Sequence, residues 1–435
     1  MSRRCFKMVL AAAAATAVLT GGFNPGHCAD RVMELSIDDC VERALEVNVA
    51  VLQANYNVER AEGAGLSALS NLLPQVSYSV NYRRSPFAGV VGDRLVPPGS
   101  FNTALYFSQP IFHGGSNIAG WLGAEADKRA AVQSMFSVEA DIALTARQRF
   151  LDVLKAQKLL EVRQEAYELS QKQLERAEAL VEVGSAVISD VLRAGVEVSR
   201  NKLDLISAEN DLRLAETGLC HFLAIDGECS IVLDEDLGIE EREYNLDEIL
   251  DSAMRMRPEV RGAEEVVKSR NYGVWQNRGN WLPRFNFSAN YSWSGEDRLK
   301  LSEAWEESEL TWGLSMSFDI FTGLSRWGRG KQYRAQLNTA KEDLAQVKRD
   351  VALEVKEAYY NVEEARQRMK VSAETVELSE EEFKLAVERY RLGAATMLEQ
   401  IDSQVSLSEA RTSYVEARYD YVISLALLAR AVGLR

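Results

Sequence analysis

The segment LLPQVSYSVNY (72–82) returns 209 residues later in the chain as WLPRFNFSANY (281–291). The same offset relates SIDDCVERAL (36–45) to NLDEILDSAM (245–254). It also relates single marker residues: Pro74, Ile111, Phe112 and Gly184 reappear as Pro283, Ile320, Phe321 and Gly393. An offset stays constant only when each helix and strand keeps its length, so the chain is expected to contain two copies of one structural unit.

Length and charge narrow the class of protein. The chain has 435 residues and a formal net charge of −15, with 50 Lys and Arg against 65 Asp and Glu. This length fits two fused copies of one unit better than unrelated domains. The excess of acid argues against nucleic acid as a partner, because nucleic-acid binding relies on clustered positive charge.

The N-terminal segment 1–29 has the pattern of a secretory signal peptide. A basic start (SRRCFK, 2–7) is followed by an apolar stretch (8–19) that is too short to span a bilayer as a helix. We expect cleavage after Ala29, and lipidation of Cys28 stays open as an alternative. No later segment is long and apolar enough for a transmembrane helix, so insertion into a membrane would require a β-barrel.

Long helices are predicted where proline is missing, from 111 to 257 and from 284 to the end of the chain. In the second stretch, apolar residues step by threes and fours from Leu337 to Met369, which is typical of a coiled-coil seam. Each copy is predicted to follow one order: opening helix, two strands, long helix, glycine turn and returning helix.

These elements have the following predicted bounds. Repeat 1 (30–222) has a helix over 36–70, strands over 74–84 and 101–112, a long helix over 116–181, a tip at Gly184 and a helix over 188–222. A linker follows over 223–244. Repeat 2 (245–435) has helices over 245–281 broken at Pro258, strands over 283–294 and 309–321, a long helix over 325–390, a tip at Gly393 and a helix over 397–431.

The predicted strands alternate apolar with small polar residues. Runs of about ten such residues are typical of outer-membrane strands, although an antiparallel sheet on a soluble core alternates in the same way. Aromatic residues with no other β segment to pack against favour the membrane. The predicted lipid-facing residues are Val76, Tyr78, Tyr82, Leu105, Phe107, Phe285, Phe287, Tyr291, Trp312 and Leu314.

Four strands per chain are too few to close a barrel, because about eight are needed to enclose even a packed interior. An open edge in lipid would leave backbone groups unpaired at several kcal/mol each. The strands therefore require an oligomer, whose order this argument leaves open.

Motifs for catalysis or for cofactor binding are missing. The histidines have no ligand spacing, so no metal and no cofactor are expected. Without a phosphate loop or a nucleophile elbow, an enzyme is not expected either. Cys220 and Cys229 are close enough in sequence to form a disulfide, with Cys40 as a third candidate, but buried thiols fit equally well.

The chain resembles the TolC-like outer membrane efflux proteins (outer membrane factors) over essentially all of its length after residue 29. The most specific likeness lies in the tip segments LVEVGSAVISDVLRA (180–194) and YRLGAATMLEQIDSQ (390–404) and in Arg257-Pro258-Glu259. The resemblance implies a mainly α fold with a β-barrel part. It also implies a homotrimer. In the trimer, four strands from each chain would form one shared transmembrane barrel, and the long antiparallel helices would form an α-helical barrel.

The resemblance also implies a function and a location. The protein would lie in the outer membrane of a Gram-negative bacterium and extend into the periplasm. It would be a passive exit duct for small molecules (drugs, metals) or secreted proteins. A periplasmic adaptor (a membrane fusion protein) and an inner-membrane transporter of the RND or ABC type would open it at its tip.

Single residues at the tips carry the rest of the resemblance. Asp190 and Tyr390 match positions whose hydrogen bond holds neighbouring helices closed, and Glu399 and Asp402 match two acidic positions around the narrowest point. Ala395 departs from the pattern, because some members carry an arginine there that braces the closed state. The residues that match the adaptor-docking tips are Val183, Gly184, Ser185, Leu392, Gly393 and Ala394.

Two alternatives stay open. The acidic residues at the second tip also fit an ordinary solvated helix face. The whole chain also fits a periplasmic coiled-coil scaffold that has no channel activity and whose short sheets mediate protein contacts. Drug efflux and type I secretion are not distinguished, because both use the same kind of duct.

Overall fold

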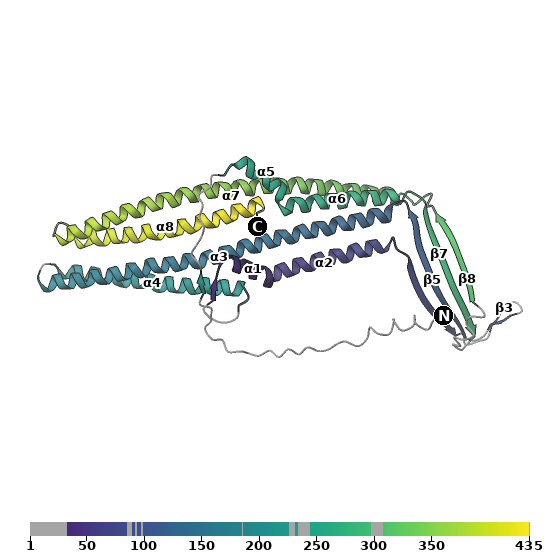
Figure 1. The fold of residues 1–435 in the computed structure, drawn as a ribbon, viewed down its shortest axis with the longest axis horizontal. Helices are drawn as coiled ribbons and strands as arrows, with labels where there is room; N and C mark the ends of the chain where they lie inside the picture. The colour runs from purple at the N-terminus through teal and green to yellow at the C-terminus, as the bar shows by residue number, and fades with distance from the viewer. Residues whose placement is uncertain are drawn as a thin grey trace, which may run out of the picture.

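A computed structural model describes residues 33–84, 89–91, 94–96, 99–184, 186–225, 231–233, 244–296 and 308–434. The predicted signal peptide, Ser185 and Cys229 lie outside these residues. The described chain is elongated, with a sheet at one end and two helical hairpins that reach to the other end (Figure 1).

Both repeats have the same order of helices and long strands. Repeat 1 contains β1 (Met33–Leu35), α1 (Ile37–Val47), α2 (Val49–Ser70), β2 (Gln75–Arg84), β5 (Gly99–His113), α3 (Ser116–Glu182) and α4 (Ile188–Phe222). Repeat 2 contains α5 (Leu246–Met256), α6 (Pro258–Gly279), β7 (Arg284–Glu296), β8 (Ser308–Ser317), α7 (Ser325–Arg391) and α8 (Met397–Val432). A short hairpin, β3 (Gly89–Val91) with β4 (Arg94–Val96), follows β2, and β6 (Ile231–Leu233) pairs in parallel with β1.

The four long strands form one antiparallel sheet in the order β2-β5-β7-β8. Repeat 1 joins repeat 2 through the pairing of β5 with β7, in which Leu105 lies opposite Tyr291. Because directly opposed residues share a face of a sheet, the register places all ten residues of the predicted lipid face on one side. Serine and asparagine dominate the other side.

The helical part consists of two long hairpins. Helices α3 and α7 each have 67 residues, which at 1.5 Å per residue gives a length on the order of 100 Å. The α3/α4 hairpin and the α7/α8 hairpin lie side by side, with α3 in contact with α8 (Figure 1). Nearer the sheet, α6 lies between α3 and α7.

Two apolar clusters hold the middle of the molecule together. One contains Phe150, Leu151 and Leu154 of α3 with Leu219 of α4, and the other contains Val355 of α7 with neighbours on α5 and α8. Cys40 and Cys220 are both buried in the first cluster. Burial, with a smaller effect of the charge of Asp39, raises the pKa of the Cys40 thiol to about 11. Among the described helices, none has the length and the apolar character needed to cross a membrane.

The opening helix of repeat 1 corrects a prediction. A single helix was expected over 36–70, but the chain turns at Asn48, where α1 ends and α2 begins. The Asn48 side chain accepts a hydrogen bond from the backbone N–H of Ala50 at 2.9 Å and so caps α2. Asn48 is the repeat equivalent of Arg257, which precedes Pro258, so both repeats break at the same place by different local means.

The last strand is shorter than expected. A strand was predicted over 309–321, but β8 ends at Ser317. Its counterpart β5 continues to His113 because β7 pairs with it as far as Arg284. In the described chain, β8 pairs only with β7, so residues 318–321 have no neighbouring strand.

Candidate gate and docking tips

The two hairpin turns are built on glycine. Gly184 and Gly393 have φ values of 71° and 70°, a left-handed conformation that glycine adopts without a side-chain clash. Backbone hydrogen bonds close each turn, with Ala186 N–H donating to Leu180 at 3.2 Å and Ala394 N–H donating to Arg389 at 2.8 Å. A Cβ on either glycine would meet open space, so backbone conformation rather than crowding requires glycine here.

At the second tip, the start of α8 is capped. Thr396 Oγ1 accepts a hydrogen bond from Glu399 N–H at 3.3 Å. Glu399 also lies 3.8 Å from Arg389 of α7, although both side chains are more than half exposed. Glu399 therefore lies close to a cation, Arg389, and its backbone N–H takes part in the cap of α8. Asp402 lies one turn further along α8 and is exposed.

Asp190 of α4 and Tyr390 of α7 lie beside the same small buried cluster, because Val191 and Tyr390 both pack against it. Burial, and then the charge of Asp190, raise the pKa of Tyr390 above its ordinary value. Tyr390 packs against a small buried cluster formed by Ala177, Ala194, Met397 and Ile401. Its hydroxyl is buried and makes no hydrogen bond to any described residue, so the expected bond to Asp190 is not formed within this chain.

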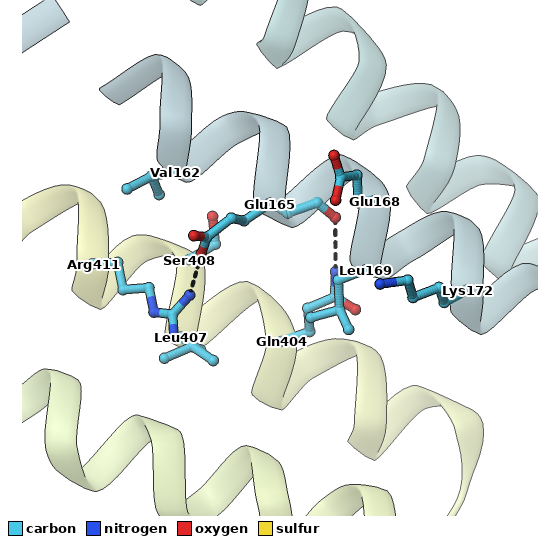
Figure 2. Close-up of a pocket in the computed structure, with 10 residues that line it drawn as sticks. Val162, Glu165, Glu168, Leu169, Lys172, Gln404, Leu407, Ser408 and Arg411 are labelled. Carbon is cyan, nitrogen blue, oxygen red and sulfur yellow. Dashed lines mark hydrogen bonds and ion pairs between the residues drawn. The ribbon is translucent and has the colours of Figure 1, made fainter. Parts of the chain in front are cut away.

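A polar seam between α3 and α8 is a feature that sequence reasoning missed. In the described residues, the other buried side-chain polar atoms without a hydrogen-bond partner are Gln173 Nε2 on α3 and the Oε1 atoms of Gln400 and Gln404 on α8. Gln404 Nε2 does donate to the carbonyl of Ala166 at 3.3 Å (Figure 2). Glutamine is common on solvated helices, so nothing in the sequence marked these three as buried.

Beside this seam runs a groove of about 250 Å³ between α3 and α8 (Figure 2). Arg411 of α8 bridges two helices there, with Nη1 2.7 Å from Glu165 of α3 and Nη2 2.8 Å from Glu380 of α7. The two hairpins are thus joined near the tips by a small apolar cluster, by amides and by partly exposed ion pairs.

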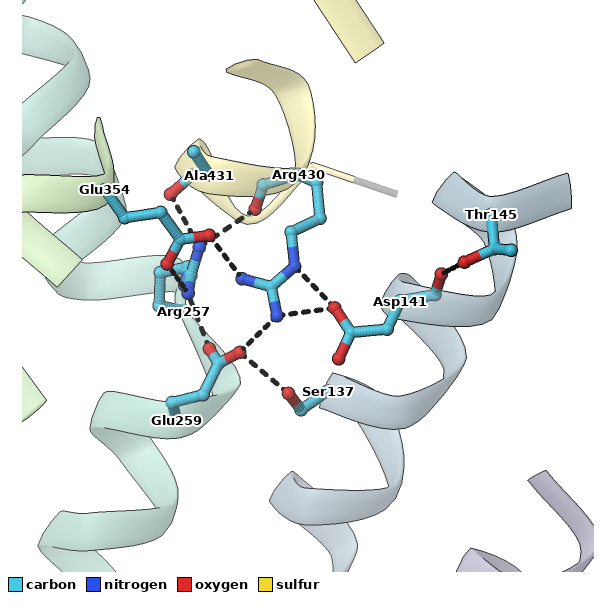
Figure 3. A network of polar contacts seen from close by, with 8 residues as sticks. All are labelled: Ser137, Asp141, Thr145, Arg257, Glu259, Glu354, Arg430 and Ala431. Atoms are coloured by element: carbon cyan, nitrogen blue, oxygen red, sulfur yellow. Dashed lines mark hydrogen bonds and ion pairs between the residues drawn. The ribbon is translucent and has the colours of Figure 1, made fainter. Parts of the chain in front are cut away.

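A second polar site lies where the short helices meet the long ones (Figure 3). The Arg257 side chain is 3% exposed, and its Nε and Nη2 atoms lie 2.9 Å from Glu259 and 2.6 Å from Glu354. Its Nη1 atom also donates to the carbonyl of Ala431 at 3.2 Å, at the end of α8. Arg257 therefore connects the α5–α6 junction to α7 and α8.

Arg430 extends this network to repeat 1. Its guanidinium lies 2.9 Å from Glu259, 3.0 Å from Glu354 and 2.6 Å from Asp141 of α3. Burial opposes the charge of Glu259, but a hydrogen bond from Ser137 and the charges of Arg257 and Arg430 outweigh it, so the pKa of Glu259 is lowered. Only Arg257 and Glu259 carried a signal in the sequence, through the Arg-Pro-Glu motif.

Comparison with known proteins identifies the family. The family model described as outer membrane efflux protein matches residues 40–224 and 249–434, which are the two repeats. The chain is 22% identical over 417 residues to outer membrane protein TolC of Vibrio cholerae, covering 94% of this chain and 93% of that one. It is 21% identical over 346 residues to outer membrane efflux protein BepC of Brucella suis, covering 79% and 71%.

A solved structure of CusC shares the fold, with a TM-score of 0.82 at 16% identity over 93% of this chain and 94% of that one. One group of proteins thus matches the whole duplicated fold, with its four-stranded sheet and its two helical hairpins. The chain belongs to the outer membrane efflux protein family, a family of channels in the outer membrane of Gram-negative bacteria.

Proposed function

We propose that this protein is the outer-membrane channel of a tripartite export system. It is a passive duct through which small molecules, such as drugs or metals, or secreted proteins leave the cell. A periplasmic adaptor docks at its tips, and an RND- or ABC-type inner-membrane transporter supplies the energy.

The observation that carries this proposal is the one-sided polarity of the sheet. Aromatic and aliphatic side chains lie on one face of all four long strands, and small polar side chains lie on the other. A sheet with an apolar outer face and a polar inner face fits a wall between lipid and water. Long helices continue from it over about 100 Å, a length suited to crossing a periplasmic space.

The duplicated chain supports a ring of copies. Within one chain, β5 of repeat 1 pairs with β7 of repeat 2. The equivalent pair, β8 with β2, lies at opposite edges of the sheet and has to form between copies. Shifting the pair Leu105–Tyr291 by 209 residues gives its register: Leu314 opposite Tyr82 of a neighbouring copy. Three copies, as the family resemblance implies, would supply twelve strands.

The helices carry the same signal. Met397 and Ile401 of α8 are 2% and 8% exposed in the cluster that α8 shares with α3, whereas their repeat equivalents on α4, Ile188 and Leu192, are 64% and 66% exposed. The α4 face is therefore uncovered in one chain and fits α7 of a neighbouring copy. There, the equivalent of the Arg411–Glu165 pair is Lys202 with Glu374, which again has opposite charges.

The gate is proposed at the tips. Asp190, Tyr390, Glu399 and Asp402 would form it, with a bond between Asp190 and Tyr390 in the closed state and six carboxylates around the axis of a trimer. Such rings favour cations. The exposed tip residues Val183, Gly184, Leu392, Gly393 and Ala394, together with Ser185, would dock the adaptor.

Single-channel conductance in a planar bilayer tests the proposal, with the mass of the oligomer measured in the same detergent. We expect a trimer with a small, cation-selective conductance. The double variant Glu399→Gln/Asp402→Asn is expected to reduce this selectivity, whereas Glu409→Gln, an exposed acid further along α8, is expected to leave it unchanged. A protein that never inserts into the bilayer would favour the periplasmic scaffold instead.

A further inference from the structure

Exposed large apolar side chains surround the end of the helical part that adjoins the sheet. Three positions are apolar in both repeats: Leu66 and Trp275, Leu73 and Leu282, and Ile118 and Trp327. We name these six residues the collar. Each is between 48% and 67% exposed. Two of the pairs exchange an aliphatic residue for tryptophan, so the two repeats share apolar bulk at these positions rather than a particular residue.

A neighbouring copy cannot account for the whole collar. Trp275 lies on α6, which already has α3 on one side and α7 on the other, and it is still 60% exposed. Its side chain therefore points away from the wall of helices and not toward the edge of the wall. The wall of helices has two surfaces, one continuous with the apolar face of the sheet and one continuous with its polar face. The first surface suits an apolar collar, because the polar face of the sheet leads to the aqueous side.

The length of the strands sets the height of the collar. The edge strands β2 and β8 each have 10 residues. At about 3.3 Å per residue and a tilt of about 45°, such a strand rises roughly 23 Å, close to the ~25 Å apolar band of outer-membrane strands. The edge strands thus span the hydrocarbon layer. Trp275 lies about one helical turn, roughly 6 Å, before the end of α6, which is the depth of the headgroup layer.

The chemistry around the collar fits headgroups. The Trp281 ring lies 6.4 Å from the Trp327 ring. The Arg326 guanidinium lies 5.6 Å from the centre of the Trp281 ring. Tryptophan has an apolar body and a polar N–H, which makes it frequent at membrane–water interfaces. Arg326 is held in place by Asp319 at 3.2 Å.

Helix α7 adds positive charge at the same level. Its first ten residues contain four basic residues and no acidic one. Arg329, Lys331 and Arg334 are exposed. Lys331 and Arg334 follow Trp327 by four and seven residues and so share its side of the helix, whereas Arg329 lies on the opposite side. Cations at a helix N-terminus oppose the helix dipole and are unfavourable by themselves, so an anionic partner would offset this cost. The first ten residues of α3 contain no basic residue, so this charge belongs to repeat 2 alone.

We propose that the collar and the basic start of α7 bind the periplasmic leaflet of the outer membrane, with the collar in the headgroup layer and Lys331 and Arg334 on lipid phosphates. This inference rests on the proposed insertion of the sheet in the membrane. It adds a lipid-binding surface on the helical part, with a preference for anionic phospholipid.

Tryptophan fluorescence in the full-length protein tests the depth of the collar. Single-tryptophan variants retain Trp327 in the collar or Trp312 in the middle of the sheet, and a Val183→Trp reporter in a background without other tryptophans marks the tip. The protein is reconstituted in phosphatidylcholine vesicles with nitroxide labels at the headgroup or deep in the acyl chain. We expect the headgroup label to quench Trp327 most, the deep label to quench Trp312 most, and neither to quench the tip reporter.

The outcomes separate the inference from the proposed function. If Trp312 is quenched and Trp327 is not, the collar lies outside the bilayer and binds protein instead, which overturns the inference and leaves the channel standing. If Trp312 is not quenched either, the membrane insertion itself fails.

Lipid charge gives the second measurement. With labelled phosphatidylglycerol in place of labelled phosphatidylcholine, we expect quenching of Trp327 at lower mole fractions, by about fivefold for each basic side chain that meets a phosphate. The triple variant Arg329→Gln/Lys331→Gln/Arg334→Gln should lose this preference. The matched variant Lys356→Gln/Arg368→Gln/Lys370→Gln changes equally exposed residues far down α7 and should retain it. Equal preference in both variants would overturn the role of the basic start.

Discussion

Replacing Arg257 by methionine should cost far more stability than its position beside an exposed surface suggests. The guanidinium is 3% exposed and bonds to Glu259, Glu354 and the carbonyl of Ala431. Methionine fills part of the space but leaves two carboxylates with one arginine, Arg430, between them. Removing one partner of a fully buried ion pair costs about 3–5 kcal/mol. Here the carboxylates left behind are 26% and 45% exposed and still pair with Arg430, so the cost is smaller, about 2 kcal/mol. We expect a loss of that size in the free energy of unfolding.

The assay is urea unfolding of the detergent-solubilised protein at neutral pH, followed by far-ultraviolet circular dichroism. Arg255→Met is the matched control, because Arg255 lies two residues earlier and pairs with Asp251 on an exposed helix face. Exposed pairs contribute about 0–1 kcal/mol. Arg257→Met costing no more than Arg255→Met would refute the reasoning, since the network would then be an incidental cluster of surface charges.

Three further outcomes are expected. The pKa of Glu259 is lowered in the folded state, so its contribution to stability is present above the ordinary glutamate pKa of 4.5 and is lost as the pH falls below it. The urea midpoints at pH 7 and pH 4 should therefore differ less in Arg257→Met than in the native protein. Gly393→Val should cost about 1–2 kcal/mol through its positive φ alone, so trimers should persist in detergent while export from cells is lost, and loss of the trimer would instead assign the glycine to folding. Lys202→Glu should lower the temperature at which the oligomer dissociates, by the roughly 0.2–1 kcal/mol of each exposed pair, and adding Glu374→Lys should restore it; no recovery would count against the proposed interface between copies.

Most of the fold is predictable because independent signals agree. The repeat offset, the missing prolines and the alternation in the strands each predict the same order of elements, which the structure shares with CusC. The break in the opening helix was predicted only at Pro258, where proline forces it. At Asn48 the same break depends on a cap, which is a weaker signal in sequence. The early end of β8 depends on a missing neighbour, and no local pattern reports that.

The candidate site was predictable only in its local parts. A helix reversal requires Gly184 and Gly393, so sequence alone indicates the tips. The approach of Asp190 to Tyr390 followed from a resemblance, since 200 residues separate them. The network of Asp141, Arg257, Glu354 and Arg430 joins parts of the chain that only the fold brings together. Charged residues on long helices are ordinary, and which of them become buried is a property of the packing.

The middle of the helical hairpins and their tips are held together by different contacts, and this difference bears on the gate proposed at the tips. Around the middle, large apolar side chains such as Phe150 and Leu154 are fully buried, and the Arg257 network adds charged bonds between repeats. Toward the tips, α3 and α8 share a smaller apolar cluster that includes Ala177, Met397 and Ile401, and beside it lie glutamines whose buried amides are only partly hydrogen-bonded. Each unpaired buried polar group costs about 1–3 kcal/mol, so the closed packing of the tips is held less firmly than the middle. In the gate proposed above, movement of the α7/α8 hairpin against α3 would hydrate these amides and the buried Tyr390 hydroxyl, and these gains would offset part of the apolar contact that is lost. On this proposal, an adaptor that binds the tips would supply the remaining free energy, while the middle of the molecule would stay in place.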